Sequence, residues 1–120
     1  MKIAISTSGN DLSAPLDPRF GRAARFLVYD TESKTVDLAG NEQNLNAAQG
    51  AGIQSAQNVA STGAKAVITG HCGPKAFRVL NASKIAVYPS TAATVQEALD
   101  LYAAGELTAA QQADVEGHWV

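Results

Sequence analysis

Residues 66–88 have the sequence AVITGHCGPKAFRVLNASKIAVY, which contains a complete strand–helix–strand unit. The apolar runs at 66–69 and 85–88 predict two buried strands. Pro74, which lies between them, is typical of the first position of a helix, where its missing N–H is no loss. A helix that connects two strands in this order predicts a parallel pair joined by a right-handed crossover.

The same alternation of strands and helices continues on both sides of this unit. Apolar residues at helical spacing mark one face of a helix over residues 50–62, for which Gly63 is a natural stop. Thr94 is a good N-cap and precedes a final helix. The apolar positions of that helix recur at helical spacing, at Val95, Ala98, Leu99 and Tyr102.

Three more strands are predicted in the N-terminal part of the chain. The apolar runs at 3–5, 26–29 and 35–38 read as strands, and the short polar turn between the last two predicts an antiparallel hairpin. Together with the parallel unit, they give an α/β fold: a mixed five-stranded sheet with one antiparallel strand and helices on both faces. The polar stretch 39–52 is long for a connection in a compact domain, which is typical of a functional loop.

Length and composition indicate one globular domain, residues 1–120. With 46% hydrophobic and 17% charged residues, the chain has an ordinary globular composition and no apolar run long enough to span a membrane. We expect residues 106–120 to form a more loosely held tail. The apolar run at the start of the sequence is too short, and turns polar too early, for a signal peptide. Cys72 is the sole cysteine, so no internal disulfide can form, and we expect a cytoplasmic location.

The charges are unevenly distributed along the chain. The formal net charge is −2, which predicts neither a nucleic-acid partner nor a membrane partner. Bases outnumber acids in residues 1–29, residues 61–90 contain bases and no acid, and residues 91–120 contain acids and no base. If the two basic segments meet in the fold, they form one positive region. The alternative is that these are ordinary solvated charges.

Two loops are candidates for a ligand site. In sheets of this kind, ligands bind beyond the carboxyl ends of the parallel strands. Loops 6–22 and 69–75 are expected at that edge, and they carry the clustered bases. We therefore expect Arg19 and Arg22 of the first loop to face the second loop, and the polar segment 39–52 to border the site.

The second loop leads directly into the helix that starts at Pro74. A helix start offers N–H groups and a partial positive charge to an anion. Gly70 and Gly73 would let the backbone approach a ligand closely, while His71 adds a donor or ligand and Lys75 a cation. The alternative is a tight strand-to-helix turn, in which the glycines serve geometry only.

Cys72 precedes the same helix, a position where the pKa of a thiol tends to fall. The alternative is a small, inert and partly buried residue. One soft ligand cannot hold a zinc or iron–sulfur site, which takes four ligands. A metal bound here, with Cys72 and His71 as its candidate ligands, would have to belong to a pre-assembled anion held mostly by charge and hydrogen bonds.

Arg19 and Arg22 flank Phe20 and Gly21 in the first loop. A guanidinium is a planar fork of donors suited to oxyanions and, by the same logic, to sulfide-rich anions. The alternative is that Phe20 fills the edge of the core and both arginines point to solvent.

Several common catalytic motifs are absent. The sequence has no phosphate-binding Gly-x-x-x-x-Gly-Lys-Ser/Thr run, no Gly-x-Gly-x-x-Gly and no His-Glu-x-x-His. A nuclease with this strand order would need carboxylates on its strands to hold magnesium, and the first strand has none. A nuclease is therefore disfavoured.

Short motifs along nearly the whole chain resemble one known family. They are KIAI at 2–5, DPRFGRA at 17–23, GAGIQ at 50–54, GA at 63–64, TG at 69–70 with GPKAF at 73–77, and GHW at 117–119. In this order they resemble the dinitrogenase iron–molybdenum cofactor biosynthesis family, which includes NifX and the C-terminal part of NifB.

The resemblance implies a ribonuclease-H-like α/β fold and a protein that carries a metal–sulfur cluster or its precursor, not an enzyme. One stand-alone member of similar length carries a molybdenum–copper–sulfide cluster without covalent attachment. The implied cargo is therefore a molybdenum–sulfur or molybdenum–copper–sulfur cluster, with a protein partner for its transfer. The residue patterns and the resemblance agree on an anion held by loops and a helix start.

Two other functions stay open. Cys72-Gly73-Pro74 after a strand resembles half of a thioredoxin motif, with Lys75 in place of the second cysteine. This pattern would suit a one-cysteine redox protein or a persulfide carrier, although it lacks a resolving thiol. A protein-interaction module without a ligand is the third possibility.

Overall fold

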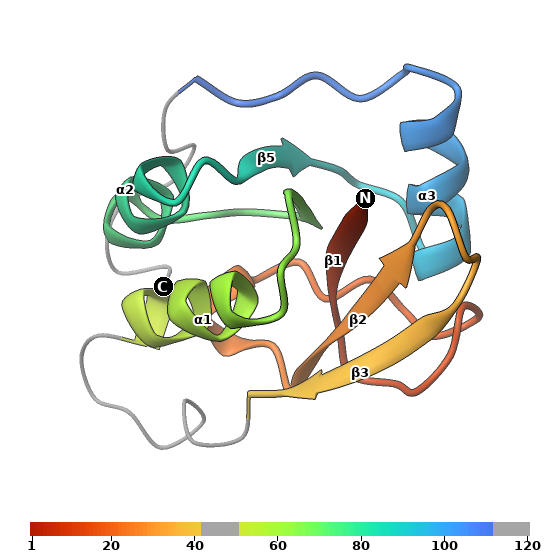
Figure 1. Cartoon of the computed structure of the whole chain (residues 1–120), viewed down its shortest axis with the longest axis horizontal. Helices are drawn as coiled ribbons and strands as arrows, with labels where there is room; N and C mark the ends of the chain where they lie inside the picture. Colours follow the sequence, from red (N-terminus) through yellow and green to blue (C-terminus); the bar gives the residue numbers. More distant parts are fainter. Residues whose placement is uncertain (42–50, 112–120) are drawn as a thin grey trace.

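A computed structural model describes residues 1–41 and 51–111 of the chain. It has one five-stranded sheet, in the order β3-β2-β1-β4-β5, with helices on both sides (Figure 1). The strands are β1 (Lys2–Thr7), β2 (Arg25–Asp30), β3 (Val36–Gly40), β4 (Ala66–Thr69) and β5 (Ala86–Pro89). The helices are α1 (Ala51–Ser61), α2 (Pro74–Ala82) and α3 (Val95–Ala103), with a short 3₁₀ turn, η1, at Phe20–Arg22.

The strand directions confirm the predicted mixed sheet. β2 is antiparallel to both of its neighbours, β1 and β3, whereas β1, β4 and β5 are parallel. The sheet therefore has one antiparallel strand, and β4–α2–β5 forms the expected parallel unit. Helices α1 and α2 lie against one face of the sheet and α3 against the other (Figure 1).

Both faces of the central strands are buried, which explains their continuous apolar sequences. In β1, Ala4 faces the α1–α2 side, while Ile3 and Ile5 face α3. In β4, Val67 and Ile68 point in opposite directions in the same way. Alternating side chains of single strands thus supply two separate cores.

The helix boundaries follow local chemistry. Pro74 is the first residue of α2, as predicted. The Thr94 hydroxyl accepts a hydrogen bond of 3.2 Å from the backbone N–H of Glu97 and so caps α3. Gly63, just beyond α1, has a φ of 83°, which glycine adopts at little cost.

The segment after α3 is held against the sheet in its described part. The backbone N–H of Ala110 donates to the carbonyl oxygen of Val87 at 2.7 Å, along the outer edge of β5. Leu107 packs against the core on the α3 side. Residues 106–111 are therefore anchored, and 112–120 lie outside the described residues. In the described ranges, no helix is long and apolar enough to cross a membrane.

Candidate functional site

The edge of the sheet at the carboxyl ends of β1, β4 and β5 collects the loops that the sequence singled out. Helices α2 and α3 begin there directly after β4 and β5. Helix α1 runs in the same direction, because it ends just before β4 starts at the opposite edge. The positive ends of three helix dipoles therefore lie at this carboxyl edge.

The loop after β1 runs across the carboxyl edge and is fixed there by buried hydroxyl groups. The Ser6 hydroxyl lies 2.7 Å from the carbonyl oxygen of Asp17 and 2.8 Å from the hydroxyl of Thr69 on the neighbouring strand. Ser6 and Thr69 are both fully buried. The N–H of Asp17 also donates to the carbonyl oxygen of Ser6 at 2.8 Å. The loop is thereby tied to β1 and β4 together.

Beyond Asp17, this loop pairs directly with the loop after β4. The N–H of His71 donates to the carbonyl oxygen of Pro18 at 2.7 Å, and the N–H of Phe20 donates to the carbonyl oxygen of His71 at 3.1 Å. Arg19 and His71 are consequently neighbours in a short parallel bridge. The prediction that these two distant loops meet is confirmed.

The missing side chain of Gly70 serves the geometry of the loop contact, which is one of the two interpretations given above. A Cβ atom at this position would lie 2.6 Å from both the Cα and the carbonyl oxygen of Pro18. The backbone that approaches Gly70 on its Cβ side is thus the chain's own, while Gly70 also lines the surface cavity described below. Gly73 is buried and extended, as the N-cap of α2.

Cys72 lies in the core between the sheet and helices α1 and α2. Only 3% of its surface is exposed, and its Sγ lies 3.8 Å from the carbonyl oxygen of Gly73. It belongs to the same apolar cluster as Phe20 and Leu80. This geometry favours the interpretation of Cys72 as a packed core residue over that of an accessible ligand or nucleophile. Phe20 is fully buried, as its predicted role as a core plug requires.

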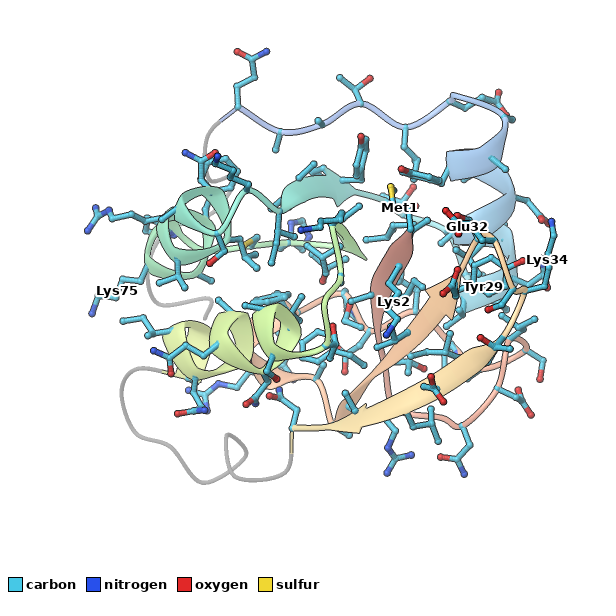
Figure 2. The ribbon with its side chains drawn as sticks, viewed as in Figure 1. Met1, Lys2, Tyr29, Glu32, Lys34 and Lys75 are labelled. Atoms are coloured by element: carbon cyan, nitrogen blue, oxygen red, sulfur yellow. The ribbon has the colours of Figure 1, made fainter. Side chains whose placement is uncertain are left out.

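The cationic side chains at the carboxyl edge come from both loops. Arg19 and Lys75 are exposed, and Arg22 and His71 are half-buried. Arg19 belongs to the turn closed by its own N–H, which donates to the Asp17 carboxylate at 3.0 Å. Figure 2 shows Lys75 at the outer side of α2.

The basic segment 61–90 is nevertheless divided between two edges of the sheet. Lys65 precedes β4, and its N–H donates to the carbonyl oxygen of Lys2 at 2.9 Å. Lys84 precedes β5 and lies at that same amino edge. In Figure 2, Lys2 and Lys75 lie far apart. The two basic segments therefore do not merge into one positive region. Instead, each segment places some of its basic residues at the carboxyl edge and some at the amino edge.

Arg25 at the start of β2 is engaged by the first loop. Its guanidinium donates to the side-chain oxygen of Asn10 at 2.6 Å and to the carbonyl oxygens of Ser8 and Gly9 at 3.2 and 3.3 Å. It therefore holds the loop in place, a role that the sequence did not indicate.

A surface cavity of about 330 Å³ adjoins the paired loops. It is lined by residues at the ends of β4 and β5 and on the α3 side, namely Gly70, His71, Pro89, Ser90, Thr91, Leu101 and Leu107. A more enclosed cavity of about 310 Å³ lies elsewhere, between α3 and the β2–β3 hairpin, and includes Tyr29, Lys34 and Tyr102. Only the first contains predicted site residues, so it is the cavity relevant here.

A buried amide network at the same edge was missed by the sequence analysis. Asn41 is fully buried, and its amide donates to the carbonyl oxygen of Ala23 at 2.8 Å and to the hydroxyl of Ser55 at 3.0 Å. The Asn58 amide donates to the Asn41 side-chain oxygen at 2.6 Å. Asn41 follows a strand directly, but in a polar stretch such a residue reads simply as part of a loop.

The network places both ends of segment 39–52 at the carboxyl edge. Asn41 also donates its backbone N–H to the carbonyl oxygen of Ala24, and Ala51 begins α1 nearby. The expectation that this segment borders the site stays a prediction. Residues 42–50 lie outside the described residues.

The described residues do not form a conventional metal site. Within 1–41 and 51–111, there is no group of three or more histidine, cysteine, aspartate or glutamate side chains that could hold a metal ion. The carboxyl edge does carry exposed or half-buried cations, Arg19, Arg22 and Lys75, which suit an anion.

Comparisons with known proteins agree with this fold. Residues 1–105 match the family model described as dinitrogenase iron–molybdenum cofactor. An uncharacterised protein of Methanocaldococcus jannaschii is 33% identical over 110 residues, which are 89% of each chain.

Two solved structures are similar over almost their full length. The apo form of the orange protein of Desulfovibrio gigas has a TM-score of 0.92 and 36% identity, and the match covers 95% of this chain and 96% of that one. A putative NifB protein from Thermotoga has a TM-score of 0.79 and 37% identity, with coverage of 90% and 91%. The predicted ribonuclease-H-like α/β fold is confirmed. The chain belongs to the dinitrogenase iron–molybdenum cofactor family.

Proposed function

We propose that this protein binds an anionic metal–sulfur cluster without covalent attachment and carries it, rather than acting as an enzyme. The observation that supports this most is the direct pairing of the two loops, which places Arg19 beside His71 where three helices begin. Membership of a family named for an iron–molybdenum cofactor points to the same class of cargo.

The proposed binding groups are the donors and cations of the carboxyl edge. Arg19, Arg22 and Lys75 supply positive charge, and His71 supplies an imidazole beside the cavity. Charge-assisted hydrogen bonds of this kind are roughly twice as strong as neutral ones. Gly70 and Gly73 contribute backbone only, and buried Cys72 contributes packing.

The proposed cargo is a molybdenum–sulfur or molybdenum–copper–sulfur cluster. The family description names molybdenum, and the similar structure from Desulfovibrio gigas is described as an apo form. Transfer of such a cargo requires a protein that supplies or receives it, which we propose as the physiological partner.

The test is an anaerobic titration of the protein with tetrathiomolybdate, with and without copper(I). We expect new charge-transfer absorption bands that the free anion lacks. Arg19→Gln should weaken binding about tenfold or more, since hydrogen bonds to charged groups are worth about 1.5–3 kcal/mol. Lys65→Gln is the matched control, because it removes the same charge from an exposed residue at the opposite edge. Equal effects of the two variants, or no spectral change, would contradict the proposal.

A second variant separates this function from thiol chemistry. If the cluster is held by charge and hydrogen bonds, Cys72→Ser should still bind it measurably. Loss of all binding, with turnover of a disulfide or persulfide by the unmodified protein, would instead support a one-cysteine redox protein or persulfide carrier.

A further inference from the structure

The two edges of the sheet differ in how they are protected. The edge at β5 is met by the chain's own C-terminal segment, through the hydrogen bond from Ala110 to Val87. Strand β3 forms the other edge (Figure 1). Among the described residues, the large hydrophobic side chains that are exposed are Met1, Val36 and Leu38, and the last two belong to β3. Exposed apolar edge strands are prone to pair with another strand.

The alternation of hydrogen-bonded pairs between β2 and β3 shows which backbone groups of β3 point away from the sheet. At one end the N–H of Asp30 donates to Thr35, and at the other the N–H of Asn41 donates to Ala24. Because hydrogen-bonded pairs alternate along an antiparallel ladder, Asp37 and Ala39 face β2. Val36, Leu38 and Gly40 therefore direct both their N–H and C=O groups away from the sheet.

The side chains of these outward residues lie on one face. Ala39 packs against the core on the α1 side, so Val36 and Leu38 lie on the α3 side. Val36 is 37% exposed and Leu38 49% exposed. A hollow of about 550 Å³ adjoins Val36 and the loop at 10–13, so this loop does not cover the strand.

We infer that β3 pairs antiparallel with β3 of a second copy of this chain, about a two-fold axis at Leu38. In this register Leu38 faces Leu38 of the second copy and Val36 faces Gly40. The outward N–H and C=O groups of all three residues then form hydrogen bonds with the second copy. Asp37 faces Ala39 of the second copy and is not opposite the second Asp37. A shift of the axis to Asp37 would set two carboxylates directly opposite each other, which is unfavourable.

The strand is thus complementary to itself in hydrogen bonding and apolar surface, and its one carboxylate lies opposite an alanine. A two-fold interface of this kind is closed, so it yields a dimer rather than a fibre. Five-residue strands bury little area, and we expect a weak dimer that forms with increasing concentration.

The test adds one cysteine at either of two adjacent β3 positions, and the native Cys72 is too buried to cross-link. In the inferred dimer the two copies of residue 38 form a hydrogen-bonded pair with Cα atoms about 5.5 Å apart, within the range of a disulfide. The two copies of residue 37 are diagonal to each other and too far apart. Under mild oxidation Leu38→Cys should form disulfide-linked dimers about tenfold faster or more than Asp37→Cys, because pairing raises the effective concentration.

Both residues are exposed, so chance collisions would cross-link them equally. Equal rates, faster linkage of Asp37→Cys, or no linkage of either variant would overturn the inference. Sedimentation equilibrium of the unmodified protein provides a second measurement. Its average mass should rise above 12.4 kDa with concentration, and Leu38→Lys should abolish the rise while leaving the circular dichroism spectrum unchanged. A mass that stays at the monomer value up to millimolar concentration would also overturn it, as would capture of a different protein's strand without self-association.

Discussion

Gly70 lacks a side chain at the point where the loops after β1 and β4 touch. Its neighbour Pro18 lies so close that any Cβ atom would overlap its backbone. The hydrogen bond from His71 to Pro18 is made one residue further along. A single missing methyl group therefore permits the pairing that places Arg19 beside His71.

Gly70→Ala should accordingly destabilise the fold by about 1–3 kcal/mol, the usual cost of forcing a methyl group into a packed site. Urea unfolding would measure the change in the free energy of unfolding. Gly105→Ala is an informative comparison, because Gly105 has a φ of 74° and nothing within 4 Å, so only backbone strain is added. That strain costs about 1 kcal/mol. A Gly70→Ala variant as stable as the unmodified protein would show that the loops can separate freely.

Cys72 should react slowly with an alkylating reagent in the folded protein, because 3% exposure leaves the reagent no access to Sγ. The rate should rise steeply in urea as the core opens. Ser61→Cys, at the exposed end of α1, provides an accessible thiol for comparison in the same chain. If native Cys72 reacted as fast as this exposed thiol, the thiol-based function would regain support.

Among the elements, the β2–β3 hairpin has a turn organised by one carboxylate. Asp30 accepts hydrogen bonds from the backbone N–H groups of Glu32 and Ser33, at 2.9 and 3.4 Å, and lies 3.8 Å from the N-terminal amine. Figure 2 shows Glu32 close to Met1 at the chain start, with Lys34 farther out on the same turn. Lys34 has a φ of 62°, a conformation that glycine usually supplies.

These contacts lower the pKa of Asp30 below its ordinary value of 3.8, chiefly through the backbone N–H of Glu32, then that of Ser33, with smaller contributions from the N-terminal amine and Lys2. Because the folded pKa is depressed, the stabilisation is present above the unfolded pKa and is lost as the pH falls through the folded one. Asp30→Asn should therefore lower the melting temperature at pH 7, and the difference should shrink as the pH falls below 3.8 and through the lowered pKa. A difference that persisted unchanged in acid would mean that the carboxylate charge is not responsible.

At the scale of the whole molecule, the directions of the strands and helices decide at which edge of the sheet each loop lies. Every strand-to-helix connection in the described part ends at the carboxyl edge, where the helix dipoles are positive. Lys2, Lys65 and Lys84 lie at the other edge, although two of them come from the same basic segment as Lys75. The fold therefore builds an anion-favouring edge from a chain whose net charge is −2.

Binding of tetrathiomolybdate should consequently weaken as sodium chloride is raised. The attracting side chains are exposed or half-buried, and exposed charges are screened over roughly 8 Å at physiological ionic strength. Titrations at low and high salt, followed by absorption, would measure the change in Kd. Affinity independent of salt would indicate an apolar or covalent mode of binding, and the assignment of the arginines would then be wrong.

Much of this architecture could be predicted because it depends on local patterns. The apolar runs, Pro74, Thr94 and Gly63 predicted most of the strands and helices to within a few residues. The pairing of the two loops could also be predicted, because parallel neighbouring strands deliver their loops to one edge. The roles of Gly70 and Cys72 could not, since each depends on which residue lies across the contact.

The sequence by itself determined the order of the elements, the mixed sheet and the edge at which the two candidate loops meet, because the apolar spacing and the glycine and proline signals are local features of the chain. Only the tertiary structure decided what the space beside Gly70 contains, on which side Cys72 lies and how the basic residues are divided between the edges. Asn41 shows the same limit, since its amide is buried by Ala23 and Ser55, which are far from it in sequence. Burial and charge clustering depend on which residues are neighbours in space. The order of residues along the chain does not show these neighbours until the chain is folded.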